Sequence, residues 1–154
     1  MPKILIVEDD QFKMDNLISL VTTVLPTAQL AQASDVSTAI SAVNRERFDL
    51  LIVDMALPSH PVIPGGGSPM SLLTGGLEVL LELSALERSD DCIIVTQYPE
   101  IEIAGRFFPV NQATLAIEEH IGYAAVSCLE YSEESAEWKN EFLGMLKKYE
   151  NTSS

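Results

Sequence analysis

Two short runs of branched apolar residues, each followed by carboxylates, constrain this sequence more than any other feature. Lys3–Val7 (KILIV) precedes Glu8–Asp10 (EDD), and Asp49–Val53 (DLLIV) precedes Asp54. Near-continuous apolar runs of this length are typical of strands that are buried on both faces of a parallel sheet. The sequence therefore predicts two central strands that carry acidic side chains at their carboxyl ends.

Apolar residues at strand-like and helical spacing alternate along the rest of the chain. Further strands are predicted over 28–33, 92–95 and 124–129, and helices over 17–24, 36–43, 77–86, 113–121 and 133–149. Strand–helix–strand crossovers are right-handed and cover both faces of a sheet. The alternation thus predicts an α/β fold: a doubly wound, five-stranded parallel sheet with helices on both faces.

Two segments depart from this alternation. Residues 59–75 are rich in Pro, Gly and Ser, which predicts a long loop, and residues 98–110 are expected to be irregular. A chain of 154 residues has room for one core. We therefore expect a single domain over 1–150 and a tail over 151–154.

The charge balance argues against several classes of partner. With 23 acidic and 9 basic residues the formal net charge is −14, whereas nucleic-acid binding needs clustered Lys and Arg. The same charge disfavours anionic membrane surfaces, and no apolar run reaches the roughly 20 residues that span a bilayer. Cys92 and Cys128 lie in apolar stretches typical of reduced thiols, and the chain starts without a signal-peptide pattern, so we expect a cytoplasmic protein.

The predicted strand ends carry the candidate functional groups. The first, third and fourth strands end at Glu8–Asp10, at Asp54 and at Thr96, and these ends should meet at one edge of the sheet. Carboxylates a few ångströms apart raise one another's pKa and oppose folding, and no lysine stands at a strand end to neutralise them. A divalent cation is therefore expected, and Mg²⁺ fits because it prefers hard oxygen ligands.

Four motifs occur in order along nearly the whole chain: Ile4–Asp10 (ILIVEDD), Asp49–Pro58 (DLLIVDMALP), Gly76–Leu80 (GLEVL) and Ile93–Thr96 (IIVT). In this order they resemble the response-regulator receiver family. The resemblance implies a flavodoxin-like fold and a role in two-component phosphorelay signalling. It also implies a signalling domain whose only chemistry is its own phosphorylation, and therefore not an enzyme in the usual sense.

The resemblance further implies roles for individual residues. Asp54 would accept the phosphoryl group, and Mg²⁺ would be held by Asp9, Asp54 and the backbone carbonyl of Ala56, with Glu8 assisting. The hydroxyl of Thr96 would move toward the phosphoryl oxygens and switch a protein-interaction surface. The implied partners are a sensor histidine kinase or phosphotransfer protein and a downstream protein, and homodimerisation is left open.

The sequence departs from the family at the end of the fifth strand. Receiver domains usually carry a lysine there, whereas Ala125–Tyr131 (AVSCLEY) contains no basic residue. That lysine normally contacts the phosphoryl group as a point charge. Arg106, in the stretch after Thr96, is the better candidate for a substitute, ahead of Arg88.

Two alternative functions compete with a phosphorylated receiver. A pseudo-receiver would keep the fold but act as a phosphorylation-independent protein-binding module, which the missing lysine favours and the retained acids oppose. A metal-dependent phosphotransferase of another doubly wound family would also use a strand-end Asp. Those families place Asp-x-Asp motifs that neither Glu8–Asp10 nor Asp54–Ala56 (DMA) matches.

Overall fold

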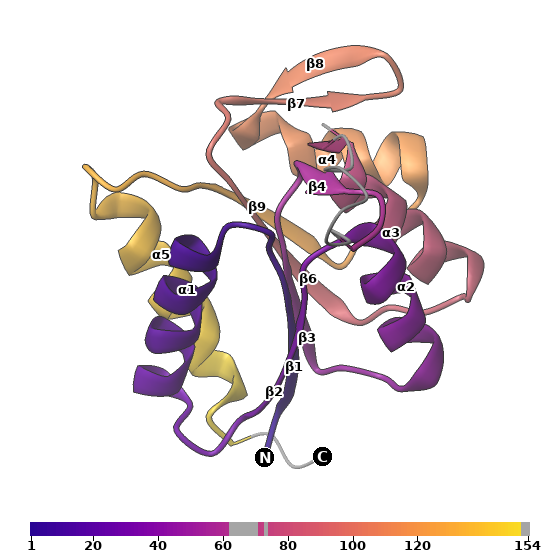
Figure 1. Ribbon diagram of the computed structural model, residues 1–154. Helices are drawn as coiled ribbons and strands as arrows, with labels where there is room; N and C mark the ends of the chain where they lie inside the picture. Colours follow the sequence, from indigo (N-terminus) through magenta and orange to yellow (C-terminus); the bar gives the residue numbers. More distant parts are fainter. Residues whose placement is uncertain (62–70, 73, 152–154) are drawn as a thin grey trace, which may run out of the picture.

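One parallel sheet organises the computed structural model, which describes residues 1–61, 71–72 and 74–151 (Figure 1). Its strand order is β2-β1-β3-β6-β9, and every neighbouring pair is parallel. The strands are β1 (Lys3–Val7), β2 (Gln29–Ala33), β3 (Leu50–Val53), β6 (Asp91–Thr96) and β9 (Val126–Glu130). The predicted doubly wound, flavodoxin-like α/β class is confirmed.

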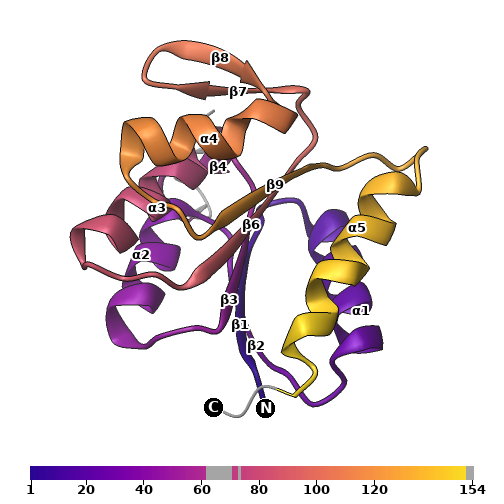
Figure 2. The same cartoon turned by 180° about the vertical axis from the view of Figure 1, so that it is seen from behind.

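Helices cover both faces of this sheet, as Figures 1 and 2 show from opposite sides. One face packs against α1 and α5, and the other against α2, α3 and α4. The helices are α1 (Gln11–Val24), α2 (Val36–Arg45), α3 (Gly75–Ala85), α4 (Val110–Ile121) and α5 (Glu137–Leu146), which continues as the 3₁₀ turn η1 (Lys147–Tyr149). None of the helices in the described part of the chain is long and apolar enough to cross a membrane.

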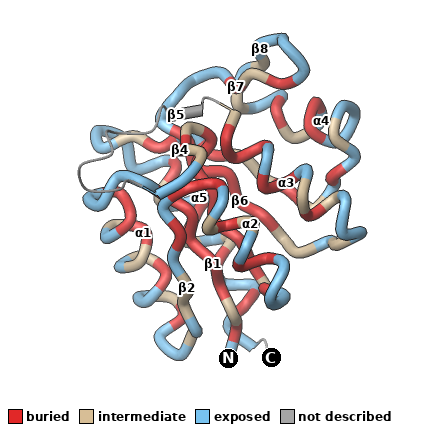
Figure 3. The backbone as a smooth tube through the Cα atoms, turned by 45° about the vertical axis from the view of Figure 1, so that its right-hand side comes forward, coloured by how far each residue is buried: buried red, intermediate tan, exposed pale blue. Residues whose placement is uncertain are grey.

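The two apolar runs singled out in the sequence form the centre of the molecule. Ile4–Val7 and Leu50–Val53 have no exposed surface (Figure 3). They pair in register from Ile4 with Leu50 to Val7 with Val53. Because two parallel strands of equal register end together, the residues that follow them, Glu8 and Asp54, leave the sheet side by side.

The stretch after β6 is not irregular, so the prediction for residues 98–110 is wrong. It forms an antiparallel hairpin of β7 (Glu100–Ile103) and β8 (Arg106–Pro109), with Ile103 paired to Arg106. The two intervening residues, Ala104 and Gly105, have φ of 53° and 79°. Positive φ at both central positions is what a two-residue type I′ hairpin turn requires.

The hairpin depends on packing that the sequence did not reveal. An isolated two-stranded hairpin is marginal in water. Here Ile101 and Ile103, on one face of β7, are buried, and both strands pack against α4. The alternation of Glu and Ile over 100–103 is a strand signal, but the Ala-Gly turn lacks the Asn or Asp that usually marks such a hairpin.

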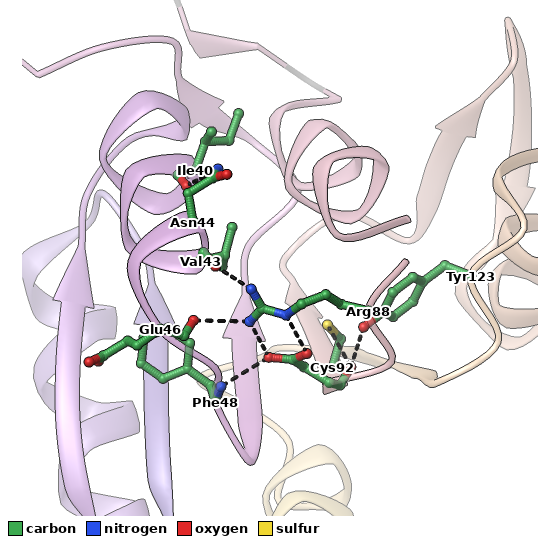
Figure 4. Close-up of polar contacts among 9 residues, drawn as sticks. Ile40, Val43, Asn44, Glu46, Phe48, Arg88, Cys92 and Tyr123 are labelled. Atoms are coloured by element: carbon green, nitrogen blue, oxygen red, sulfur yellow. Dashed lines mark hydrogen bonds and ion pairs between the residues drawn. The ribbon is translucent and has the colours of Figure 1, made fainter. Parts of the chain in front are cut away.

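A half-buried arginine, Arg88, links the segments at the end of the sheet where β3 and β6 begin (Figure 4). The guanidinium of Arg88 donates to both carboxylate oxygens of Asp90 and to the backbone carbonyls of Val43 and Glu46. Burial opposes ionisation of Asp90, but hydrogen bonds from Arg88 and from the Phe48 amide outweigh it and lower the pKa of Asp90. These contacts lie where β3 and β6 begin, away from the strand ends that carry the acids.

The predicted loop over 59–75 is described only in part. β4 (Leu57–Pro58) pairs in antiparallel fashion with β5 (Ser71–Leu72), whereas residues 62–70 and 73 lie outside the described residues. A single domain over 1–150 with a tail over 151–154 stays a prediction. Cys92 and Cys128 are free thiols, as expected.

Replacing Gly105 by alanine should lower the free energy of unfolding by about 1 kcal/mol, because an L-residue is disfavoured at its φ of 79°. A Cβ at this position meets nothing within 4 Å, so only backbone conformation contributes. Gly144→Ala, in the last turn of α5 and equally unobstructed, should raise the free energy of unfolding by about 0.5 kcal/mol. Urea unfolding measures both, and equal effects at the two positions would contradict the turn geometry.

Candidate functional site

Three carboxylates meet beyond the ends of β1 and β3. One oxygen each of Glu8, Asp9 and Asp54 lies within 4.8 Å of the others. Glu8 is 2% and Asp54 6% exposed, whereas Asp9 is exposed to solvent. The backbone amide of Asp54 donates to the carbonyl of Val7 at 3.0 Å, which holds the two strand ends together. The cluster is therefore buried on one side and open on the other.

A lysine that the sequence analysis did not assign to the site completes this cluster. The Lys13 ammonium is 2.8 Å from Oε1 of Glu8 and 3.3 Å from Oδ1 of Asp54. It also donates to the carbonyl of Val95, near the end of β6, at 2.8 Å. Lys13 is 2% exposed. The expectation that no lysine is available to neutralise the strand-end acids is thus corrected, because Lys13 reaches them from α1.

Local structure explains how Lys13 reaches the strand ends. Asp10 is the N-cap of α1, and its side chain accepts a hydrogen bond from the amide of Lys13 at 3.1 Å. A residue in the first turn of a helix directs its side chain back toward the helix N-terminus, which here adjoins β1. An N-cap Asp with a lysine three residues later, directly after a strand-end acid, is the sequence signal that was missed.

Burial dominates the electrostatics of the two inner carboxylates. Burial, together with the neighbouring charge of Asp54, raises the pKa of Glu8 to about 7, against the opposing charge of Lys13. Burial likewise raises the pKa of Asp54, again against Lys13. One ammonium does not fully compensate two buried carboxylates, so the cluster favours additional positive charge.

The oxygens in the cluster fit a hard divalent cation. Among the described residues, the Lys13 ammonium is the one polar group that meets Oε1 of Glu8 and Oδ1 of Asp54. Buried carboxylate oxygens with so few partners are costly, and a coordinating cation would compensate them. Ala56, predicted to contribute its carbonyl, is half-buried in the turn between Asp54 and β4.

Thr96 is fully buried at the end of β6. Its Oγ1 accepts a hydrogen bond from the Tyr98 amide at 3.2 Å, and its carbonyl accepts one from the Tyr131 amide at 2.7 Å. A largely apolar cavity of about 230 Å³ lies beside it and includes Tyr98 and Phe107, both exposed. The predicted switch residue therefore connects the end of β6 to the surface.

Arg106, the expected substitute for a strand-end lysine, does not contact Asp54 in the structure. It is exposed on β8, and its guanidinium lies over the ring of Phe108, 5.7 Å from the centroid. The cation that contacts Asp54 is Lys13.

Comparison with known proteins adds an independent observation. The chain is 37% identical over 147 residues to the Detocs response regulatory protein DtcB of Vibrio alginolyticus, a match that covers 94% of this chain and 99% of that protein. No protein-family model matches the chain.

Solved structures with low sequence identity share the fold. The response regulator TrrA of Thermotoga maritima, solved in complex with Mg²⁺-BeF, has a TM-score of 0.61 and 20% identity and covers 95% of this chain and 99% of its own. The receiver domain of the sensor histidine kinase PA1611 of Pseudomonas aeruginosa, with magnesium in its active-site cleft, has a TM-score of 0.59 and 16% identity, with 98% of both chains covered.

In the presence of a chelator, the protein should lose stability as the pH rises from about 4.5 to about 7. The ordinary pKa of Glu8 is 4.5 and its pKa in the fold is about 7, so the folded protein binds more protons in this window. Ionisation of Glu8 should cost on the order of 2 kcal/mol. Urea unfolding across this range measures it, and Glu8→Gln should flatten the dependence. An unchanged slope in that variant would contradict the assignment.

Gly76→Ala should disturb the strand end that carries Asp54. A Cβ at Gly76 would lie 2.5 Å from the carbonyl oxygen of Asp54 and 3.0 Å from Cα of Met55, so the backbone must move. Overpacking of this kind should lower the free energy of unfolding by about 2 kcal/mol. Urea unfolding of Gly76→Ala, with the unobstructed Gly144→Ala variant as the control, tests this. If Gly76→Ala were as stable as the wild type, the backbone would accommodate the Cβ without loss of stability, contrary to the prediction.

Proposed function

Because the chain belongs to the family of response-regulator receiver domains, we propose that it accepts a phosphoryl group on Asp54 in a Mg²⁺-dependent reaction. The family is one of signalling proteins in two-component systems. The observation that carries the proposal is the position of Asp54, a buried strand-end carboxylate beside Glu8 and the solvent-exposed Asp9. This is a nucleophile with an acidic cation site next to it.

The acids of the cluster are suited to hold the metal ion. Asp9, Asp54 and the backbone carbonyl of Ala56 would hold Mg²⁺, with Glu8 assisting from its buried position. Bound there, Mg²⁺ offsets the negative charge of the phosphoryl oxygens. Solved receiver structures of the same fold contain magnesium, which supports the same ion here.

The residues of the chain supply the remaining chemistry. A carboxylate oxygen of Asp54 forms the new P–O bond while the bond between phosphorus and the donor breaks, and the donor leaves with the electron pair. The hydroxyl of Thr96 would then donate to a phosphoryl oxygen. Because its Oγ1 accepts from the Tyr98 amide, such a movement would alter the surface around Tyr98 and Phe107.

Partners follow from this chemistry. A sensor histidine kinase or a phosphotransfer protein would donate the phosphoryl group, and a downstream protein would read the switched surface. The pseudo-receiver alternative drew its support from the missing strand-end lysine. The contact between Lys13 and Asp54 weakens that support.

A small acyl phosphate with Mg²⁺ should add one phosphoryl group to the protein, as measured by intact mass. Asp54→Asn should abolish the adduct, because the amide lacks the nucleophilic oxygen charge, and a chelator should abolish it in the wild type. Asp91→Asn, a change at the opposite end of β6, serves as the matched control and should be labelled normally. A wild type that stays unlabelled, beside a receiver that is labelled under the same conditions, would favour the pseudo-receiver.

A further inference from the structure

We propose that Lys13, from the first turn of α1, supplies the cation that contacts the phosphoryl group on Asp54. This inference rests on the proposed function and assigns to α1 a role that the family gives to the end of the fifth strand. It makes Lys13 a catalytic residue, because its ammonium would touch the reacting group.

The geometry places the Lys13 ammonium beside the nucleophile. Its nitrogen is 3.3 Å from Oδ1 of Asp54 and 2.8 Å from Oε1 of Glu8. A phosphoryl group on Asp54 would bring its own oxygens within reach of a group this close. An ammonium carries three donors, so Lys13 can keep its 2.8 Å hydrogen bond to the Val95 carbonyl and still donate to a phosphoryl oxygen.

No other cation of the chain is placed for this role. All 9 basic residues are described, and Lys13 is the one among them that is buried. Four of the others have partners elsewhere: Lys3 pairs with Glu46, Arg88 with Asp90 and Lys148 with Asp91, and Arg106 lies over Phe108. The remaining four are on α2, α5, η1 or the turn before β3: Arg45, Arg47, Lys139 and Lys147.

An aromatic residue follows β9, the strand whose end carries the lysine in most receivers. β9 ends at Glu130, and the next residue, Tyr131, is buried with its ring 5.2 Å from the Lys13 nitrogen. The Tyr131 hydroxyl accepts from Asn16 of α1 at 3.1 Å. In this chain the segment after β9 therefore contributes an aromatic ring instead of a lysine. The ring makes a favourable cation–π contact with Lys13 of α1.

The chemical task of such a cation is electrostatic. As the P–O bond to Asp54 forms and the donor bond breaks, negative charge on the phosphoryl oxygens must be offset in a site shielded from water. Lys13 would donate a hydrogen bond without losing its proton. It also opposes the metal ion in the resting protein, because it contacts oxygens of Glu8 and Asp54 that would face Mg²⁺.

These two effects separate a catalytic role from a structural one. Lys13→Met should slow formation of the phosphoryl adduct at least about tenfold. The same variant should bind Mg²⁺ at least as tightly as the wild type, because a competing cation is gone.

The experiment measures the labelling rate with an acyl phosphate by intact mass, and Mg²⁺ affinity by isothermal titration calorimetry. It compares the wild type with Lys13→Met, Lys13→Arg and Lys3→Met. The last makes the same substitution at the start of β1, away from the acids that follow its end. We expect slow labelling with intact metal binding for Lys13→Met, partial recovery for Lys13→Arg, and a rate within about twofold of the wild type for Lys3→Met.

A second pair of variants protects the test from misfolding. Lys13→Met leaves the buried charge of Glu8 unpaired, which destabilises the fold. The double variant Glu8→Gln with Lys13→Met removes that charge as well. Compared with Glu8→Gln alone, it should again be labelled at least about tenfold more slowly.

Each outcome decides the matter. Wild-type labelling of Lys13→Met, or of the double variant relative to Glu8→Gln, overturns the inference while the proposed function stands. Slow labelling that parallels a loss of Mg²⁺ affinity also overturns it, since Lys13 would then only shape the metal site. A wild type that takes up no phosphoryl group overturns the proposed function and the inference with it.

Discussion

The burial of two carboxylates against one ammonium is the constraint on which the site depends. Removing a carboxylate from water costs several kcal/mol unless a partner compensates it. Glu8 and Asp54 are forced together because β1 and β3 pair in register and end at the same level. Lys13 meets both of them and the Val95 carbonyl, so one side chain connects α1, β1, β3 and β6. The pocket is thereby preorganised for a further cation.

Asp10 links local structure to this chemistry. It directly follows the acids of β1, it caps α1, and the amide it accepts from belongs to Lys13. The position where the helix starts therefore determines where the ammonium lies. A shift of the cap by one residue would rotate Lys13 by about 100° around the helix axis and away from Asp54. The proposed catalytic cation is in this sense a consequence of helix capping.

The hairpin of β7 and β8 contributes to the surface beside the pocket. The hairpin begins at Glu100, shortly after Thr96, and packs on α4. Its exposed Phe107 and the neighbouring Tyr98 line the cavity that Thr96 reaches. A movement of the Thr96 hydroxyl would break its hydrogen bond with the Tyr98 amide and so affect this surface directly.

The sequence by itself determined the sheet, its layers and the position of the acids, because buried parallel strands are read from local apolar runs and their ends share one edge. Glu8, Asp9 and Asp54 were found in this way. Only the tertiary structure decided the cation and the hairpin. Lys13 reaches Asp54 through the packing of α1 on the sheet, and β7 is stable through burial of Ile101 and Ile103 near α4. The cap at Asp10 and the alternation of Glu and Ile in β7 are local signals. The contacts that decide the site and the hairpin, Lys13 with Asp54 and β7 with α4, join residues far apart in the chain, so these local signals do not determine them.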